Sequence, residues 1–341
     1  MKRWHTIVIG LIISGVFLYL SLRSADFKQI ATAFRTARYG YVALAAASVL
    51  LTTLVRGLRW SVLTQGRLGV LDGFWLFNIG FLFNNVLPAR LGEFARAFLA
   101  GRRPGMHFTS ALSSIVVERL FDMVAVVLMI VLVLLVLPLP AWAAQAGAAM
   151  GAIALAGIVV LAVAVRRPGW ALSAGASVLA LLPGVERDRA HAFLLPFVEG
   201  LGGVSDLRTF TLGLGLSIFA WLVSGVAGWL LMLAFWPSVP IIVALLAVAA
   251  AGLGISIPAA PGGVGPYEAA VIGVLVGIGY NADISRSFAF ALHGINFAMT
   301  TALGLLGLLR EGVSFGQVAE GARSLRTGVS AEEQAGEVEP L

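Results

Sequence analysis

The chain has 341 residues, of which 59% are hydrophobic and only 12% are charged, with a formal net charge of +6 and a mean hydropathy of +0.95. Soluble domains carry about 25% charged residues, and apolar runs of about 20 residues, long enough to span a bilayer, recur along this sequence. These properties exclude an ordinary soluble protein and predict an all-α, polytopic integral membrane protein. There is no cysteine, which excludes disulfides and thiol chemistry.

The N-terminal stretch MKRWHTIVIGLIISGVFLYL begins with basic residues, as a signal peptide does. Its apolar part is long and lacks a convincing small-residue cleavage site, so we expect a retained first membrane helix at residues 5–22. Residues 26–38 are too polar to cross a bilayer and resemble an interfacial amphipathic helix, as do 170–183 and 190–203.

Full spans are predicted in six apolar segments, at about 5–22, 40–58, 108–137, 141–165, 209–235 and 287–309. With the regions between them they form one transmembrane domain, residues 1–310. The remaining residues, 311–341, are polar, small and acidic, and we expect them to be a short, disordered cytoplasmic tail.

Two further apolar regions, 73–100 and 241–279, are broken by proline and glycine. Pro88 removes a backbone N–H from the first region, and Gly92 permits a tight reversal. The second region repeats this order in ISIPAAPGGVGPYEAAVIGVL, where the hairpin-forming residues are Pro258, Pro261, Gly262, Gly263 and Gly265. Broken backbone at membrane depth needs surrounding protein or a water-filled cavity. We therefore expect two re-entrant helical hairpins that enter from opposite faces, as in an inverted repeat.

The distribution of the 23 Lys and Arg residues predicts the orientation. If both broken regions enter and leave on the same side, most of these residues share one face with both termini. Such residues are enriched on the cytoplasmic side of membrane proteins, so we expect a multi-pass protein of the cytoplasmic (plasma) membrane with both termini in the cytoplasm. If 73–100 crossed once instead, everything downstream would invert and the bias would weaken.

Charged residues lie within the span 108–137, in the stretch VVERLFDMVAVV. An ionised group at such a depth costs about 2.5–3.5 kcal/mol on insertion scales, so these residues require partners. The charged residues of this span and of the first hairpin sum to zero formal charge: Arg90, Glu93, Arg96, Glu118, Arg119 and Asp122. This neutral set has two interpretations, a structural network of buried ion pairs and a site where arginines meet a phosphate.

Three polar residues of the C-terminal half are further candidates. Glu268 begins the helix that returns from the second hairpin, where it either caps the helix N-terminus or acts as a protonation or amine-contact point. His293 and Asn296 are three residues apart on the last span and face the same way, on its outer side. They are candidate polar contacts, although a lone membrane histidine is more often a hydrogen-bonded packing residue.

Three ordered motifs, LPARLGEFARAFL, VVERLFDMVAVV and IPAAPGGVGPYEAAVIGVL, resemble the signature stretches of the flippase-like transmembrane domain of lysylphosphatidylglycerol synthases. The resemblance extends from about residue 5 to 310. In bifunctional members that domain is associated with moving an aminoacylated lipid across the bilayer, and a separate cytoplasmic domain makes the lipid. Residues 311–341 do not resemble a synthase domain, so lysyl transfer is not expected.

The resemblance implies a flippase- or scramblase-like transporter of a phosphate-bearing lipid, either a phospholipid or a polyprenyl-phosphate type. Its substrate-binding residues would be those of the charged set together with Glu268. No ATP-binding signature is present, so uphill transport would need an ion gradient or a partner.

The alternative is a non-transporting scaffold or a lipid-modifying accessory protein in cell-envelope lipid synthesis. A membrane-embedded enzyme should show metal-spaced clusters, whereas the four histidines are scattered. We expect no catalytic residue, no metal, no cofactor and no nucleic-acid partner. Membrane lipids with an anionic headgroup are the expected partners, and a lipid-synthesis enzyme is a candidate partner.

Overall fold

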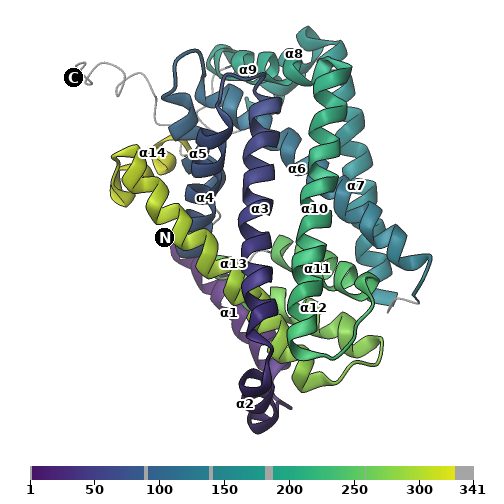
Figure 1. Cartoon of the computed structure of the whole chain (residues 1–341). Helices are drawn as coiled ribbons and strands as arrows, with labels where there is room; N and C mark the ends of the chain where they lie inside the picture. Colours follow the sequence, from purple (N-terminus) through teal and green to yellow (C-terminus); the bar gives the residue numbers. More distant parts are fainter. Residues whose placement is uncertain (1, 88–90, 138–140, 181–186, 258, 327–341) are drawn as a thin grey trace. The chain divides into compact units, whose positions relative to one another are not determined.

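The structure is a computed structural model that describes residues 2–87, 91–137, 141–180, 187–257 and 259–326. All regular structure in these ranges is helical, as the composition predicts (Figure 1). The longer helices are α1 (Lys2–Leu22), α3 (Tyr39–Leu63), α4 (Val70–Val86), α6 (Phe108–Leu134), α7 (Ala141–Arg166), α10 (Leu207–Phe235), α11 (Ile241–Ser256) and α13 (Ala282–Glu311). The shorter helices are α2 (Phe27–Thr36), α5 (Gly92–Gly101), α8 (Pro168–Leu179), α9 (Arg187–Leu201), α12 (Pro266–Gly277) and α14 (Phe315–Arg326), with 3₁₀ turns η1 (Gly202–Ser205) and η2 (Pro261–Gly263).

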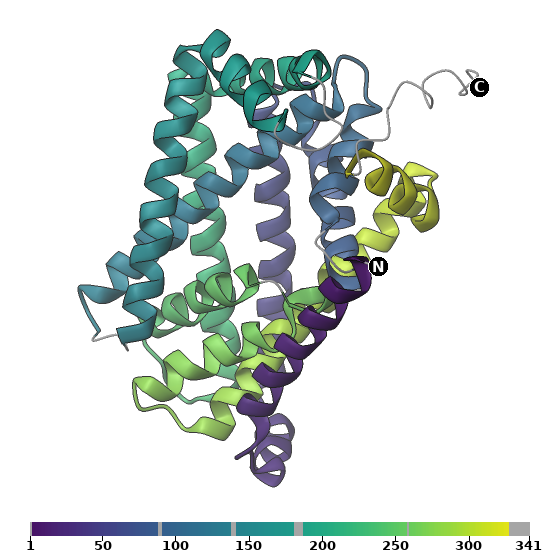
Figure 2. The same cartoon turned by 180° about the vertical axis from the view of Figure 1, so that it is seen from behind.

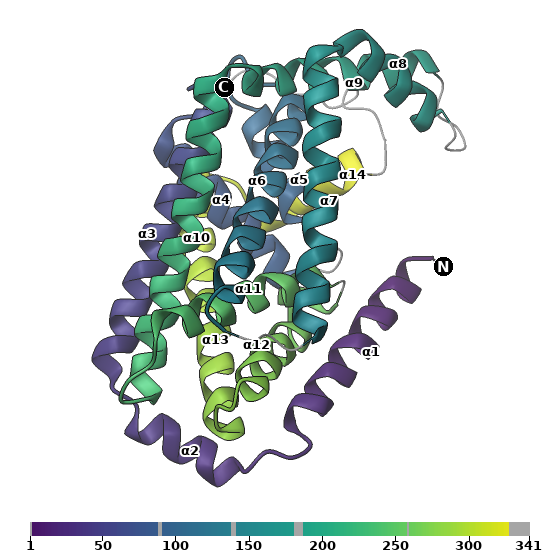
Figure 3. The ribbon, with the colours of Figure 1, turned by 90° about the vertical axis from the view of Figure 1, so that its right-hand side faces the viewer.

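Each of the six predicted spans is a helix, with ends shifted by a few residues. Among the described residues, four helices are long and apolar enough to cross a membrane: α3, α7, α10 and α13. The pair α1 and α2, bent by 83°, raises this number to five if it counts as one broken span (Figure 3). The remaining predicted span, α6, is 27 residues long, but Glu118, Arg119 and Asp122 interrupt its apolar sequence.

The chain divides into two compact units. Unit 1 comprises Met1–Arg56, Arg119–Ile158 and Gly213–Thr300. Its core surrounds α11, whose residues from Val243 to Ala251 are all buried, because a helix that is apolar on every side is stable only when it is enclosed. α12 packs beside α11, and α1 runs along α12 (Figure 2).

Unit 2 comprises Gly57–Glu118, Val159–Leu212 and Thr301–Leu341. Its core contains Trp60 from α3 and Phe83 from α4, together with Val318 and Ala322 from α14. α5 packs between α4 and α14, and α8 packs against α9. Each unit therefore contains one of the two broken apolar regions.

The two broken regions form helix–break–helix structures, as predicted. In the first, α4 has 17 residues and α5 has 10; in the second, α11 has 16 and α12 has 12. At 1.5 Å per residue the longest of these helices reaches about 26 Å, less than the hydrocarbon core of about 30 Å. The helices of each pair pack against each other as a helical hairpin. Pro88, Arg90 and Pro258 lie outside the described residues.

Gly92 has a different role from the one predicted. It is the first residue of α5 and does not adopt a positive φ. A Cβ at this position would lie 2.0 Å from the carbonyl oxygen of Gly80. Gly92 is therefore required for the close approach of α4 and α5, and not for a tight reversal of the chain.

Helical structure extends further than predicted in two places. The span predicted at 40–58 ends too early, because α3 continues to Leu63 and buries Trp60 and Leu63. The expectation of disorder is also wrong for residues 315–326 of the tail, which form α14. This helix buries Val318, Ala319 and Ala322, and burial of this apolar face outweighs its polar composition.

The expected amphipathic segments are helices at α2, α8 and α9. α2 has no buried residue, and the Asp26 carboxylate caps its N-terminus by accepting the backbone N–H groups of Lys28 and Gln29. An exposed helix with one polar and one apolar face suits the membrane–water interface.

Candidate functional site

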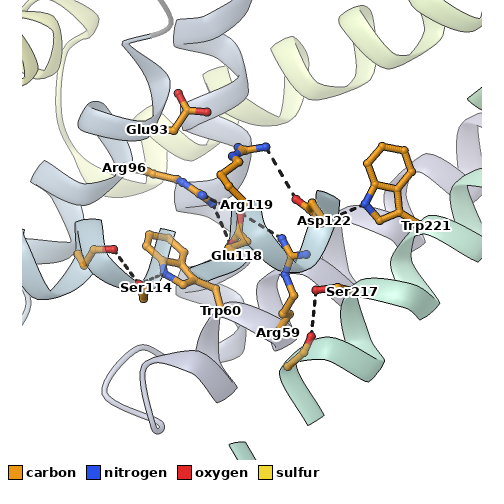
Figure 4. Close-up of polar contacts among 12 residues, drawn as sticks. Arg59, Trp60, Glu93, Arg96, Ser114, Glu118, Arg119, Asp122, Ser217 and Trp221 are labelled. Atoms are coloured by element: carbon orange, nitrogen blue, oxygen red, sulfur yellow. Dashed lines mark hydrogen bonds and ion pairs between the residues drawn. The ribbon is translucent and has the colours of Figure 1, made fainter. Parts of the chain in front are cut away.

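A buried ion pair joins the first hairpin to α6 in unit 2 (Figure 4). The Arg96 guanidinium of α5 donates to Glu118 Oε1 at 2.7 Å and to Oε2 at 3.4 Å. Arg59 of α3 also contacts Glu118 Oε1, at 3.0 Å. The side chains of Arg59 and Glu118 are fully buried, and that of Arg96 is 2% exposed. Glu118 is thus held by two arginines from two different helices.

Aromatic rings fix the position of Arg96. Its guanidinium lies 4.8 Å from the ring centre of Trp60 and 5.2 Å from that of Phe77, within the range of a cation–π interaction. The Trp60 indole N–H donates to Ser114 Oγ at 2.9 Å, so the ring that supports Arg96 is itself anchored to α6. This second layer keeps the ion pair in one geometry.

Arg59 is the residue of this group that sequence reasoning missed. It lies in TLVRGLRWSVL, one residue beyond the predicted span 40–58, so it was not considered as a partner for Glu118. The apolar residues on both sides were the available signal that the helix continues. Arg119 is adjacent to Glu118 in the sequence, but the structure places Arg96 and Arg59 on the Glu118 carboxylate.

A second charged group lies one residue further along α6, in unit 1. Arg119 Nη1 is 3.8 Å from Asp122 Oδ2, and the Arg119 side chain is 40% exposed. Asp122 Oδ1 accepts the indole N–H of Trp221 at 3.0 Å, and the Arg56 guanidinium lies 5.6 Å from the centre of the same indole ring. Asp122 is therefore held in place while Arg119 remains accessible.

Glu93 completes the described part of the predicted charged set. Its carboxylate accepts from the Asn84 amide at 3.3 and 3.4 Å, and Asn84 Oδ1 accepts the backbone N–H of Gly92 at 2.8 Å. These bonds tie the end of α4 to the beginning of α5. The charged residues that the sequence grouped together thus form two separate pairs, Arg96 with Glu118 and Arg119 with Asp122. Glu93 instead contacts Asn84 of its own hairpin.

The second hairpin contains a buried glutamate–histidine pair in unit 1. Glu268 Oε1 is 2.6 Å from His293 Nδ1, and Glu268 Oε2 accepts the Gly265 backbone N–H at 2.7 Å. His293 Nε2 is 3.0 Å from the carbonyl oxygen of Gly262. Glu268 therefore makes the capping contact, one of the two alternatives for this residue, and His293 is its partner.

The turn between α11 and α12 is built from glycines with positive φ. Gly262, Gly263 and Gly265 have φ values of 74°, 72° and 101°, which other residues adopt at a cost. Ser14 of α1 clamps this turn, since its hydroxyl donates to the Val264 carbonyl at 2.7 Å and accepts the Ala260 N–H at 2.9 Å.

Asn296 was predicted to share a role with His293. Its amide donates to the Leu292 carbonyl of its own helix at 2.8 Å, so this contact is local. In the described ranges, no group of three or more His, Cys, Asp or Glu side chains could hold a metal ion.

The fold and the charged helix define a class, a multi-pass helical membrane protein with two helical hairpins and ion pairs within its apolar helices. The model of the lysylphosphatidylglycerol synthase TM region matches residues 7–304 of the chain. The chain belongs to this family, and the resemblance read from its three motifs is confirmed.

Three relatives have similar sequences. The chain is 26% identical to Glycosyltransferase AglD of Haloferax volcanii, over 96% of this chain but only 58% of that protein's length. A UPF0104 membrane protein of Methanothermobacter thermautotrophicus is 24% identical over 90% of this chain and 92% of its own length. Another, from Methanocaldococcus jannaschii, is 26% identical over 60% of this chain and 83% of its own length. No solved structure matches the chain.

Proposed function

We propose that this protein moves a phosphate-bearing lipid between the leaflets of the bilayer, and that Arg119 contacts the headgroup phosphate. The observation that carries the proposal is the contrast between two neighbours on α6. Glu118 is fully buried between arginines, whereas the Arg119 side chain is 40% exposed within an apolar helix. A charge exposed at this position of a membrane helix is costly, and such residues mark substrate pathways by default.

The chemistry of arginine supports a phosphate as the ligand. The guanidinium offers a planar set of donors that matches phosphate oxygens and keeps its charge at any physiological pH. Asp122 lies 3.8 Å from Arg119, longer than a short charge-assisted hydrogen bond of about 2.7–2.9 Å. Because Trp221 holds Asp122, the carboxylate orients Arg119 without moving toward it.

The buried group in unit 2 has a supporting role in this proposal. Arg59, Arg96 and Glu118 hold α3, α5 and α6 together, and the Arg96–Glu118 pair fixes the first hairpin. We propose that both hairpins are re-entrant and enter from opposite faces, with both chain termini in the cytoplasm and the protein in the plasma membrane. The lengths of α4 and α11, both below the roughly 20 residues that a span usually needs, support this topology.

The name of AglD favours a second candidate function. That relative is a glycosyltransferase by name, and the present chain matches 58% of its length. A protein that presents lipids to a transferase, or modifies them itself, would also bind a phosphate headgroup. This candidate predicts lipid binding without lipid translocation.

Reconstitution separates the two candidates. The purified full chain is placed in liposomes that contain fluorescent phosphatidylglycerol, and dithionite then bleaches the probes of the outer leaflet. We expect the protein to increase the fraction that becomes bleached over that in protein-free liposomes. Losing a hydrogen bond to a charged group costs about 1.5–3 kcal/mol, so Arg119→Gln should slow translocation by about 10- to 150-fold.

Arg35→Gln is the matched control, because Arg35 is exposed on α2 and should leave the rate unchanged. Liposomes with a fluorescent polyprenyl phosphate test the other lipid type. If the folded protein binds either lipid but moves neither, the accessory function is correct and the transport proposal is wrong. If Arg119→Gln transports like the wild type, Arg119 does not contact the headgroup.

A further inference from the structure

The Glu268–His293 pair is more elaborate than a helix cap requires. A cap needs only the bond from the Gly265 N–H to Glu268 Oε2. The other carboxylate oxygen contacts His293, which stacks on Tyr267 with ring centres 4.3 Å apart. Both partners are buried, His293 with 9% and Glu268 with 3% of the side chain exposed. The number of protons that this buried pair binds therefore needs to be determined.

The contacts of the imidazole ring determine how many protons the pair holds. His293 Nε2 faces the Gly262 carbonyl oxygen at 3.0 Å, and a carbonyl can only accept, so Nε2 must carry a proton. The 2.6 Å contact between Nδ1 and Glu268 Oε1 requires a second proton between these two atoms. The pair therefore holds two protons, whether the second belongs formally to histidine or to glutamate.

Loss of one proton would break one of these contacts. If Nδ1 keeps its proton and Nε2 loses its own, two lone pairs face each other at the Gly262 carbonyl. If the shared proton leaves, the Nδ1 lone pair faces a carboxylate. Both alternatives leave one buried acceptor facing another with no proton between them, which is unfavourable.

The side chains around the imidazole show which groups can bind or release the proton. Among the described residues, the titratable side chains that contact His293 are Glu268 and the stacked Tyr267, both on α12. Phe297 is its other ring neighbour, on α13, and α1 contributes the uncharged Ser14 to the same turn. Histidine is the side chain whose ordinary titration falls nearest physiological pH.

We infer that Glu268 and His293 form a proton-binding site that locks the α11–α12 turn, and that release of one proton unlocks it. With two protons bound, Gly262 is tied to α13 through His293, and Gly265 is tied to Glu268. With one proton, one of the contacts that hold the glycine turn is lost. If the protein transports lipid as proposed, this site is where a proton gradient would act; only this last step rests on the proposed function.

Hydrogen–deuterium exchange tests the lock without any transport measurement. The full chain in nanodiscs is exchanged at several pH values, and rates are corrected for the intrinsic pH dependence of exchange. We expect protection of the Gly265 N–H to be constant at low pH and then to fall by about tenfold per pH unit, the slope for one released proton. The Gly92 N–H is the matched control, because its acceptor, Asn84, does not titrate.

Two variants and one spectrum complete the test. His293→Gln removes the imidazole, and in Glu268→Gln the amide can donate to Nδ1 while a neutral imidazole keeps its Nε2 proton on the Gly262 carbonyl. Neither variant needs the second proton, so the corrected protection of Gly265 should no longer depend on pH. If these variants do not fold, ¹⁵N NMR of histidine-labelled wild type gives the same information, since the ring nitrogens of one histidine should report the loss of either the Nε2 proton or the proton shared between Nδ1 and Glu268 as the lock opens. Protection of Gly265 that is independent of pH in the wild type would overturn the inference, as would a His293 ring whose nitrogen signals do not change with pH.

Discussion

The two hairpins resemble each other in outline but are held in different ways. The α4–α5 hairpin is fixed by Arg96 on Glu118, and arginine keeps its charge in proteins. The α11–α12 hairpin is fixed by His293 on Glu268, a contact that requires a shared proton. The first is therefore a permanent attachment, and the second depends on proton binding. The same helix–break–helix sequence can thus serve as a support or as a movable part.

The largest expected effect concerns the glycine contacts that both hairpins share. Gly92→Ala would place a Cβ 2.0 Å from the Gly80 carbonyl oxygen, and Gly254→Ala would place one 2.5 Å from the Pro266 carbonyl oxygen. Both clashes are with backbone, so the helices must separate. We expect a loss of stability that exceeds both the ~1–3 kcal/mol typical of overpacking and the ~3–5 kcal/mol of a broken buried ion pair, with Gly92→Ala the more severe. Thermal unfolding in detergent measures the effect.

Gly215→Ala is the control for this prediction, because a Cβ there meets nothing within 4 Å. It should be neutral or slightly stabilising, since alanine favours a helix over glycine. Equal unfolding temperatures for Gly92→Ala and Gly215→Ala would contradict the close approach of α4 and α5.

The next effect tests how strongly the Arg96–Glu118 ion pair fixes the first hairpin. Glu118→Gln leaves Arg59 and Arg96 buried without their carboxylate, and breaking a buried pair costs about 3–5 kcal/mol. The double variant Arg96→Gln with Glu118→Gln should recover part of this loss, because one buried charge then remains instead of two. Chemical unfolding of the purified variants checks the order. A double variant less stable than Glu118→Gln would show that Arg96 stabilises the fold through its aromatic contacts more than through Glu118.

A smaller effect distinguishes how the two turns are clamped. Ser14→Ala removes two hydrogen bonds to the second turn, and Asn84→Ala removes the acceptor of the Gly92 N–H in the first. Each should cost about 1–3 kcal/mol, the penalty for leaving a buried polar group unsatisfied. Exchange protection should fall only at the turn whose clamp is removed. Loss of protection at both turns in either variant would mean that these clamps are not local.

The smallest effect concerns α14. Ser314 and Gln317 cap its N-terminus, with Ser314 Oγ accepting the Gln317 N–H at 3.2 Å and Gln317 Oε1 accepting the Ser314 N–H at 2.9 Å. Ser314→Ala should destabilise this helix by about 0.5–2 kcal/mol. Because α14 packs on α5, limited proteolysis after residue 313 should be faster in the variant, while the second hairpin keeps its exchange rates. An unchanged cleavage rate would show that packing, and not the cap, determines this helix.

Hydrophobic length and proline position were enough to predict the helices and both breaks. Helix ends were missed where burial overrides composition, as in α3 beyond residue 58 and in α14, because a single sequence does not show which face is covered. Glu118 and Asp122 were recognised as needing partners, but Arg59 and Trp221 were not assigned to them. These partners come from other helices, and spacing along one helix cannot predict contacts between helices.

Ser14 also has a consequence for the biogenesis of the protein. It lies on α1, yet the residues that it binds, Ala260 and Val264, are synthesised about 250 positions later. At about 5–20 residues per second, α1 waits some 12–50 s for them. During this interval its polar hydroxyl resides in lipid or against an insertase. Ribosome-bound chains that stop before residue 260 should therefore crosslink α1 to the insertion machinery, and longer chains should release it.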